Sequence, residues 1–326
     1  MAAADQIKSL IKSFAENDEV RFYTTAMQIA ASEARNGHKG LADELKKIID
    51  KAKSEKSLNL GVVKALPQNA AQKELKDLLD LSHPKDKLKD MVLKPNLEKS
   101  LKRILDEQHK SELLRQNNLF PRKKLLFVGP SGTGKTMSAG VLASELGLPL
   151  FIIRLDGLIS RYMGESISKL RLIFDAMYQI KAVYLFDEFD SIGSTRTNSN
   201  DLGEIKRVLN TFLIQIEKDN SNSLIIAATN LPEQLDKALF RRFDDIINYP
   251  YPEKKEILKL LKHELFELRK SVNLDLNKIA EGTIGLSFAE IHRICEDITK
   301  DFLVYGLNEV SEEKLLSYAK LRKQPY

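Results

Sequence analysis

The chain has 326 residues, of which 43% are hydrophobic and 30% charged, so it is long enough for two or three domains with cores of their own. Its 51 basic and 46 acidic residues leave a net charge of only +5, which gives no argument for nucleic-acid binding. One cysteine excludes an intrachain disulfide framework, and no apolar run reaches the roughly 18 residues of a membrane span, so we expect a cytoplasmic protein without a membrane span.

The first sixty residues are expected to form a small helical bundle. Apolar residues recur at helical spacing around residues 7–14, 20–30 and 41–49, and a break falls at residues 36–40. No cluster of catalytic side chains occurs in this part. Two interpretations stay open, a structural cap and a module that docks a substrate or partner. Residues 61–84, which contain Gly61 and Pro67, are expected to be a linker.

Residues 85–250 have the pattern of an α/β domain with a parallel sheet, because short apolar runs alternate with helical segments. An amphipathic helix is expected after Pro95. The expected strands are Leu125–Val128, Leu150–Arg154, Ala182–Phe186, Leu224–Ala228 and Asp245–Tyr249. Residues 251–326 are expected to be helical throughout and to form a C-terminal lid. Cys295 lies on the apolar face of a lid helix and is expected in its core, and the histidines have no metal-ligand spacing, which predicts no transition-metal site.

The most informative motif lies between the first of these strands and the helix that follows. Its residues are Gly129, Pro130, Ser131, Gly132, Thr133, Gly134, Lys135 and Thr136, followed by Met137. Glycines let the backbone approach a phosphate closely, and the N–H groups of such a loop form an anion-binding nest at a helix N-terminus. We therefore predict a P-loop in which Lys135 reaches the β- and γ-phosphates and Thr136 holds Mg²⁺.

Two adjacent carboxylates end the strand Ala182–Phe186. Asp187 is expected to orient the Mg²⁺ shell and Glu188 to polarise an attacking water. Such acids are weak evidence alone, since any strand can end in a polar loop, but strand ends beside a P-loop are where an open α/β sheet places its ligand.

Three further positions carry less specific signals. Asn230 follows another strand and could contact the γ-phosphate or the water, although an ordinary turn asparagine is an equal alternative. Arg241 and Arg242 are either a solvated pair or a transition-state phosphoryl contact. Tyr162, Met163 and Gly164 form a loop whose aromatic residue either packs internally or is presented to a polypeptide.

Together these motifs resemble the AAA family of ATPases, and in particular its protein-remodelling branch with katanin and spastin. The similarity covers roughly residues 88–321. It implies Walker A at 129–136, Walker B ending at Asp187 and Glu188, sensor 1 at Asn230, arginine fingers at Arg241 and Arg242, and pore loop 1 at 161–166, where Tyr162 and Met163 grip substrate. The stretch 285–291 resembles the start of the sensor-2 helix, and the branch has no sensor-2 arginine, as here.

The resemblance implies ATP hydrolysis in a ring of six subunits, in which the arginines of one subunit complete the ATP site of the next and a protein substrate is moved through a central pore. Some bacterial ATPases of this layout resemble partners of subtilisin-like proteases. Two alternatives remain: a DNA-associated AAA ATPase of clamp-loader or initiator type, and a nucleotide-gated scaffold without turnover. The missing sensor-2 arginine and the small net charge count against the first, and Glu188 counts against the second.

Overall fold

The computed structural model describes residues 19–35, 38, 40–49, 70–158, 164–193, 202–270, 272, 274–306 and 310–323. The chain divides into two compact units, Met1–Pro67 and Gln68–Tyr326. Within the described residues, no helix is long and apolar enough to cross a membrane.

The first unit contains two described helices, α2 (Glu19–Arg35) and the helical residues 40–49. Both match helices expected from the apolar spacing. The helix expected around residues 7–14 lies outside the described residues. Ala30, Ala42 and Ile49 are buried in this unit, so each described helix contributes small or branched apolar side chains to its interior.

The second unit is built on a six-stranded sheet of order β1-β3-β4-β5-β2-β6. The strands are β1 (Leu79–Ser82), β2 (Lys124–Val128), β3 (Leu150–Ile153), β4 (Val183–Phe186), β5 (Leu224–Thr229) and β6 (Asp245–Asn248). Strands β2 to β6 pair in parallel, and β1 pairs antiparallel with β3 at one edge. The five expected strands and the expected α/β class are therefore confirmed.

The segment 61–84 is not simply a linker. Residues 70–82 form α4 (Ala70–Leu78) and the edge strand β1, and α4 packs on the same unit, with Leu75 and Leu78 buried. Arg154 Nε donates to Asp80 Oδ2 at 2.8 Å, which fastens β1 near the end of β3. The strand is only four residues long and follows the helix without a break, so its sequence reads as a continuation of the helical pattern.

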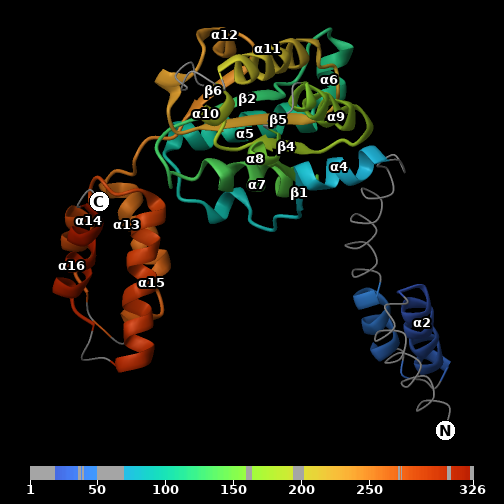
Figure 1. The fold of residues 1–326 in the computed structure, drawn as a ribbon. Coiled ribbons are helices and arrows are strands. Elements are labelled where there is room, and N and C mark those ends of the chain that lie inside the picture. Colours follow the sequence, from blue (N-terminus) through green and yellow to red (C-terminus); the bar gives the residue numbers. More distant parts are fainter. Residues whose placement is uncertain are drawn as a thin grey trace. The chain divides into compact units, whose positions relative to one another are not determined.

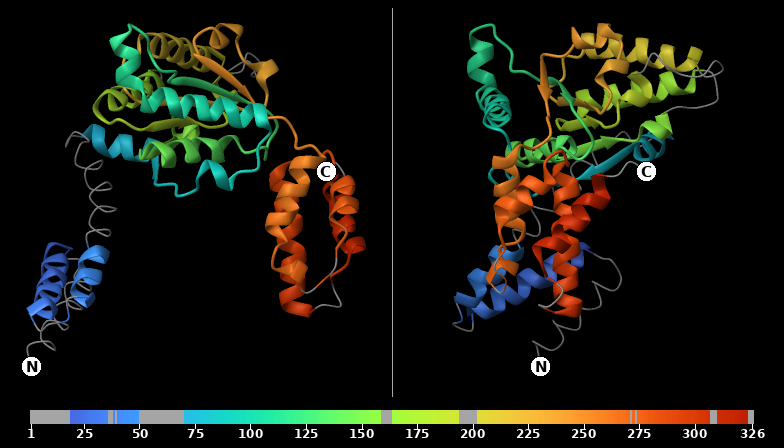
Figure 2. Two further views of the ribbon diagram at one scale, coloured as in Figure 1. Left: turned by 180° about the vertical axis from the view of Figure 1, so that it is seen from behind. Right: turned by 90° about the vertical axis from the view of Figure 1, so that its left-hand side faces the viewer.

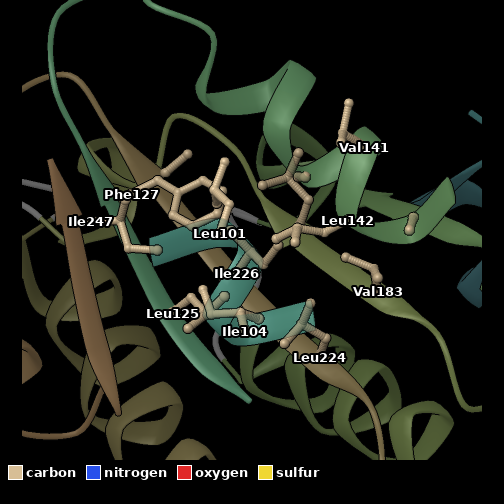
Figure 3. Close-up of a cluster of buried hydrophobic side chains, with 14 of the residues drawn as sticks. Leu101, Ile104, Leu125, Phe127, Val141, Leu142, Val183, Leu224, Ile226 and Ile247 are labelled. Carbon is tan, nitrogen blue, oxygen red and sulfur yellow. The ribbon is translucent and has the colours of Figure 1, made fainter. Parts of the chain in front are cut away.

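Helices cover both faces of the sheet (Figure 1). The helices of this domain after β1 are η1 (Leu88–Asp90), α5 (Pro95–His109), α6 (Ser111–Gln116), α7 (Lys135–Leu146), α8 (Leu155–Leu158), α9 (Glu165–Gln179), α10 (Asp190–Gly193), α11 (Leu202–Lys218), η2 (Pro232–Gln234) and α12 (Lys237–Phe240). Alternate strand residues enter two cores, as expected for a sheet buried on both sides. Val183 packs with α5 and α7 (Figure 3), while Phe186 contacts Phe174 of α9 and Phe212 of α11.

The C-terminal lid is helical, as expected, and appears in red tones in Figure 2. It comprises α13 (Lys254–Glu264), η3 (Leu268–Lys270), α14 (Leu276–Thr283), α15 (Phe288–Tyr305) and α16 (Glu312–Lys323). Its own core includes Ile257, Ile291 and Cys295, which confirms the expected burial of the cysteine. Ser287 caps α15, since its hydroxyl accepts from Glu290 N–H while the Glu290 carboxylate accepts from Ser287 N–H.

Candidate nucleotide-binding and catalytic site

Three neighbouring strands bring the expected site residues together. In the order β4-β5-β2, the carboxyl ends of the strands lead into Asp187, Asn230 and Gly129 respectively. Parallel pairing places these ends at the same edge of the sheet. Thr136 and Asp187, 51 positions apart, and Lys135 and Asn230, 95 positions apart, therefore come into contact at this edge.

The P-loop is held by close backbone contacts. Gly129 has a φ of 156°, and a Cβ built there would lie 2.1 Å from the carbonyl oxygen of Tyr249, just after β6. Gly132 has a φ of 74°, and its Cβ would lie 2.6 Å from Ser287 Oγ at the start of α15. Ala289 N–H also donates to Gly132 O at 3.1 Å. The loop thus contacts both the end of the sheet and the lid, and a side chain fits at neither position.

Lys135 lies at the centre of the loop. Its Nζ donates to Gly129 O at 2.6 Å, to Pro130 O at 2.8 Å and to Asn230 Oδ1 at 2.7 Å. Burial lowers the pKa of Lys135, and the carboxylates of Asp187 and Asp190 oppose this change. A buried cation bound only to neutral oxygens is well placed to bind an anion that enters the loop.

The hydroxyl of Thr136 and the carboxylate of Asp187 meet beside this lysine. Thr136 Oγ1 donates to Asp187 Oδ2 at 2.6 Å, so two oxygen ligands of the kind that Mg²⁺ prefers already face each other. Glu188 has a φ of +48°, a left-handed backbone that costs a residue with a side chain about 1–2 kcal/mol. Strain of this kind is concentrated at functional sites, and Glu188 lines the same cavity as the loop.

Asp190 is a site residue that is not predictable from the sequence alone. Its Oδ1 accepts from Thr229 Oγ1 at 3.0 Å and from Asn230 N–H at 3.2 Å. The backbone of Phe189 is joined to the same strand, since Phe189 N–H donates to Ala228 O at 2.8 Å. These bonds orient Asn230 toward Lys135. The only signal in the sequence is an acid two positions after Glu188, which alone does not predict the contact.

A cavity of about 610 Å³ extends from the P-loop between the large domain and the lid, a typical volume for a bound small molecule. Ser131, Met137, Asp187, Glu188 and Asn230 all line it, as do Gly132, Thr133, Gly134, Lys135 and Thr136. It is also lined by Asp86, Asp90, Met91, Val92, Leu93, Leu260, His263, Glu264, Phe288, Ala289 and His292. The sequence alone predicts no role for this second set.

Arg241 and Arg242 do not line this cavity and differ from each other. Arg242 Nη1 donates to Ala238 O at 2.8 Å, and its Nε donates to Glu217 Oε2 at 3.2 Å, so its guanidinium is bound within its own chain. Arg241 is exposed and follows the last residue of α12 as its C-cap. Its guanidinium makes no hydrogen bond or ion pair with any residue the structure describes. The two adjacent arginines are therefore not equivalent.

Of the expected substrate loop, only Gly164 is described. It has a φ of 86° and precedes the first turn of α9, and no atom lies within 4 Å of a Cβ built on it. Tyr162 and Met163 lie outside the described residues.

The sheet order, the loop at the end of β2 and the helical lid define a P-loop nucleotide-binding ATPase domain. Residues 125–251 match the family described as "ATPase family associated with various cellular activities (AAA)". An uncharacterized AAA family ATPase of Sinorhizobium fredii is 33% identical over 96% of this chain and 93% of its own length. The chain belongs to the AAA family of ATPases and is an ATP-hydrolysing enzyme.

Further relatives match a smaller share of the chain. A katanin p60-like ATPase of Rattus norvegicus is 37% identical over 61% of this chain, and its counterpart in Homo sapiens is 36% identical over the same share. The match spans only 43% of those proteins. The crystal structure of the FIGL-1 AAA domain is similar with a TM-score of 0.60 over 78% of this chain and 89% of that domain, at 23% identity, which supports the fold.

Proposed function

We propose that the protein hydrolyses Mg²⁺-ATP as one member of a six-membered ring and couples hydrolysis to the remodelling or unfolding of a protein substrate in a central pore. The observation that carries this proposal is the convergence of Lys135, Asp187, Glu188 and Asn230 on one cavity at the ends of three adjacent strands.

The P-loop suits the phosphates of ATP. Its N–H groups would surround the β- and γ-phosphates, and Lys135 would exchange its bonds to Gly129 O and Pro130 O for phosphate oxygens. Thr136 Oγ1 and Asp187 Oδ2, 2.6 Å apart, would hold Mg²⁺ directly or through its waters. The ion would neutralise charge on the phosphates during transfer.

Glu188 is the proposed general base. Its left-handed backbone lies two residues after the end of β4, and it lines the same cavity as Asn230. Its carboxylate would accept a proton from the water that attacks the γ-phosphate. Asn230, fixed by Asp190 through its N–H at 3.2 Å, would orient that water or the γ-phosphate.

Arg241 is the proposed contact to the ATP of the next subunit. Its guanidinium is outside its own cavity and unpaired among the described residues, whereas Arg242 is bound to Glu217 and Ala238 O. We therefore assign the phosphate contact to Arg241 and a supporting role to Arg242. An arginine supplied by a neighbour contributes about 10³–10⁵ in rate, so isolated subunits should hydrolyse ATP poorly.

The proposed substrate is a polypeptide. The relatives named katanin share the ATPase part of the chain, and Tyr162 and Met163 would grip an extended segment in the pore. Tyr162→Ala should reduce ATP-dependent unfolding of a protein substrate while keeping basal ATP turnover. Equal unfolding by the variant and the wild type would refute the role of this loop.

A mixing experiment tests the shared site most directly. Glu188→Gln keeps its own arginines but lacks the base, and Arg241→Ala keeps the base but cannot complete its neighbour's site. Each variant alone should have at most about one thousandth of wild-type turnover. In a ring that mixes both, some sites combine an intact Glu188 with an intact Arg241, so activity should reappear.

The ratio of the two variants is then varied at constant total concentration. Recovery that peaks at intermediate ratios supports shared sites. The absence of recovery, with both variants in the same assemblies by size-exclusion chromatography, would contradict them. Wild-type turnover in Glu188→Gln alone would remove the role proposed for this residue. Glu296→Gln, on the lid and away from the cavity, is the matched control and should behave as the wild type.

A further inference from the structure

The lid contributes to the cavity a polar group that the proposed hydrolysis does not use. Glu264 ends α13, and His292 lies on α15, one turn after its start. His292 Nδ1 lies 3.0 Å from Glu264 Oε2, and His263 Nδ1 lies 3.7 Å from Glu264 Oε1. All three side chains line the cavity that contains the P-loop.

Apolar side chains flank this group. Met91, Val92 and Leu93 line the cavity from the large domain, and Leu260 and Phe288 line it from the lid. Once the triphosphate is fixed at the P-loop, a flat base fits between apolar walls of this kind. The polar atoms of Glu264 and His292 would then face an edge of the base, where hydrogen bonds determine which base is accepted.

Glu264 is the residue with the clearest chemical preference. An ionised carboxylate only accepts hydrogen bonds, and the Glu264 side chain is 21% exposed. Burial raises the pKa of Cys295, and the charge of Glu264 adds to this rise. The three side chains are not a metal site, since no group of three potential metal ligands gathers among the described residues.

Purine bases differ at the position that such an acceptor would contact. Adenine presents an amino group that donates at position 6, whereas guanine and hypoxanthine present an oxygen there. A carboxylate bonds the amino group and repels the oxygen. A site built around a hydrogen bond rejects an analogue that lacks the matching group, because its own polar atom is left unpaired.

We propose that Glu264, positioned by His292, accepts a hydrogen bond from the 6-amino group of the base and so selects 6-aminopurine nucleotides over 6-oxopurine nucleotides. This inference rests on the proposed function, because it requires the nucleotide to bind with its phosphates at the P-loop. Glu264 is the specificity-determining residue, and His292 is a positioning residue that acts through it.

Besides Asp187 and Glu188, two further carboxylates line the cavity from the large domain. Asp90 Oδ2 already accepts from Lys87 N–H at 2.9 Å, which caps η1. Asp86 is exposed on the loop before η1, so it has water as a competing partner. Asp86→Asn therefore provides a matched control, since it removes a negative charge from a large-domain residue that lines the same cavity.

The test compares the affinities of ATP and ITP for the full-length protein by competition with a fluorescent ADP analogue. Hydrolysis is not needed, so Mg²⁺ is omitted. The wild type should prefer ATP by about 10- to 100-fold, as expected for one hydrogen bond to a charged group. Glu264→Gln should bring this ratio close to one, because an amide also donates to the 6-oxo group. His292→Ala should lower the ratio in part, and His292→Gln, which keeps a donor for Glu264, should restore it.

The outcomes are separable. The inference would be overturned if Glu264→Gln left the ratio of ATP to ITP affinity unchanged, for example by weakening both affinities equally. It would also be overturned if Asp86→Asn changed this ratio and Glu264→Gln did not. Either result would leave the proposed function in place. If the wild type bound neither nucleotide, the proposed function would fail and the inference with it. A ratio that changes in Glu264→Gln but not in Asp86→Asn supports Glu264 as the residue that reads the base.

Discussion

Replacement of Gly132 by alanine tests whether the P-loop and the lid are packed against each other. A Cβ at this position would lie 2.6 Å from Ser287 Oγ and 2.9 Å from Ala289 Cβ. Both distances are well below the contact distance of about 3.5 Å for such atoms. The start of α15 would have to move away, and the bond from Ala289 N–H to Gly132 O, now 3.1 Å long, would break.

The expected loss has two parts. The φ of Gly132 is 74°, and an alanine in a left-handed conformation costs about 1–2 kcal/mol. The broken hydrogen bond adds about 0.5–1.5 kcal/mol. Gly147→Ala isolates the first part, since Gly147 has a φ of 64° but no atom within 4 Å of its built Cβ. Gly132→Ala should therefore be less stable than Gly147→Ala by about 1 kcal/mol.

The free energy of unfolding of both variants is measured by urea denaturation without nucleotide. Separate spectroscopic probes monitor the unfolding of the lid and of the large domain. In thermal unfolding the difference corresponds to about 2–4 °C. Saturating ATP should then stabilise Gly147→Ala more than Gly132→Ala, because the displaced lid would bind the nucleotide less tightly. Equal loss in the two variants without nucleotide would show that the lid does not pack on Gly132.

Two further predictions concern groups outside the site. Asp219→Ala should lower the free energy of unfolding by about 3–5 kcal/mol, because the Asp219 side chain is 0% exposed and pairs with Lys123 Nζ at 2.7 Å; a loss below about 1 kcal/mol in urea denaturation would contradict this. Burial, with a smaller effect of the Glu264 charge, raises the pKa of Cys295 from 9.0 to about 12. At pH 8 the native thiol should react with Ellman's reagent roughly 1000-fold more slowly than the unfolded chain, and equal rates would refute its burial.

Residues close in sequence to a strand end were predictable, because local rules determine where they lie. The P-loop motif requires a strand before it and a helix after it, and the structure has β2 and α7 there. Asp187 and Asn230 directly follow apolar runs, so their positions at the edge of the sheet follow once those runs are strands. The apolar face of the lid helix likewise predicted the burial of Cys295.

Features that depend on packing between distant segments were not predictable. Strand β1 gains its pairing only from β3, about seventy residues later, and its own sequence continues a helical pattern. Glu264 and His292 meet because α13 and α15 pack side by side, and neither residue has a neighbour in sequence that marks it. Asp190 acts through Thr229 and Asn230 on another strand, so its role is visible only once β4 and β5 are paired.

The contacts of the P-loop also bear on how ATP binding could reach the lid. Gly129 packs on the Tyr249 carbonyl, at the point where the sheet ends and the chain continues into α13, while Gly132 packs on the start of α15. The loop therefore contacts the end of the sheet at one point and the lid at another. Since Lys135 must release Gly129 O or Pro130 O to bind a phosphate, a change in the loop acts on both contacts together. A motion confined to α15 would leave the Tyr249 contact unchanged, so cross-linking at each contact with and without ATP distinguishes concerted motion of the lid from local motion of one helix.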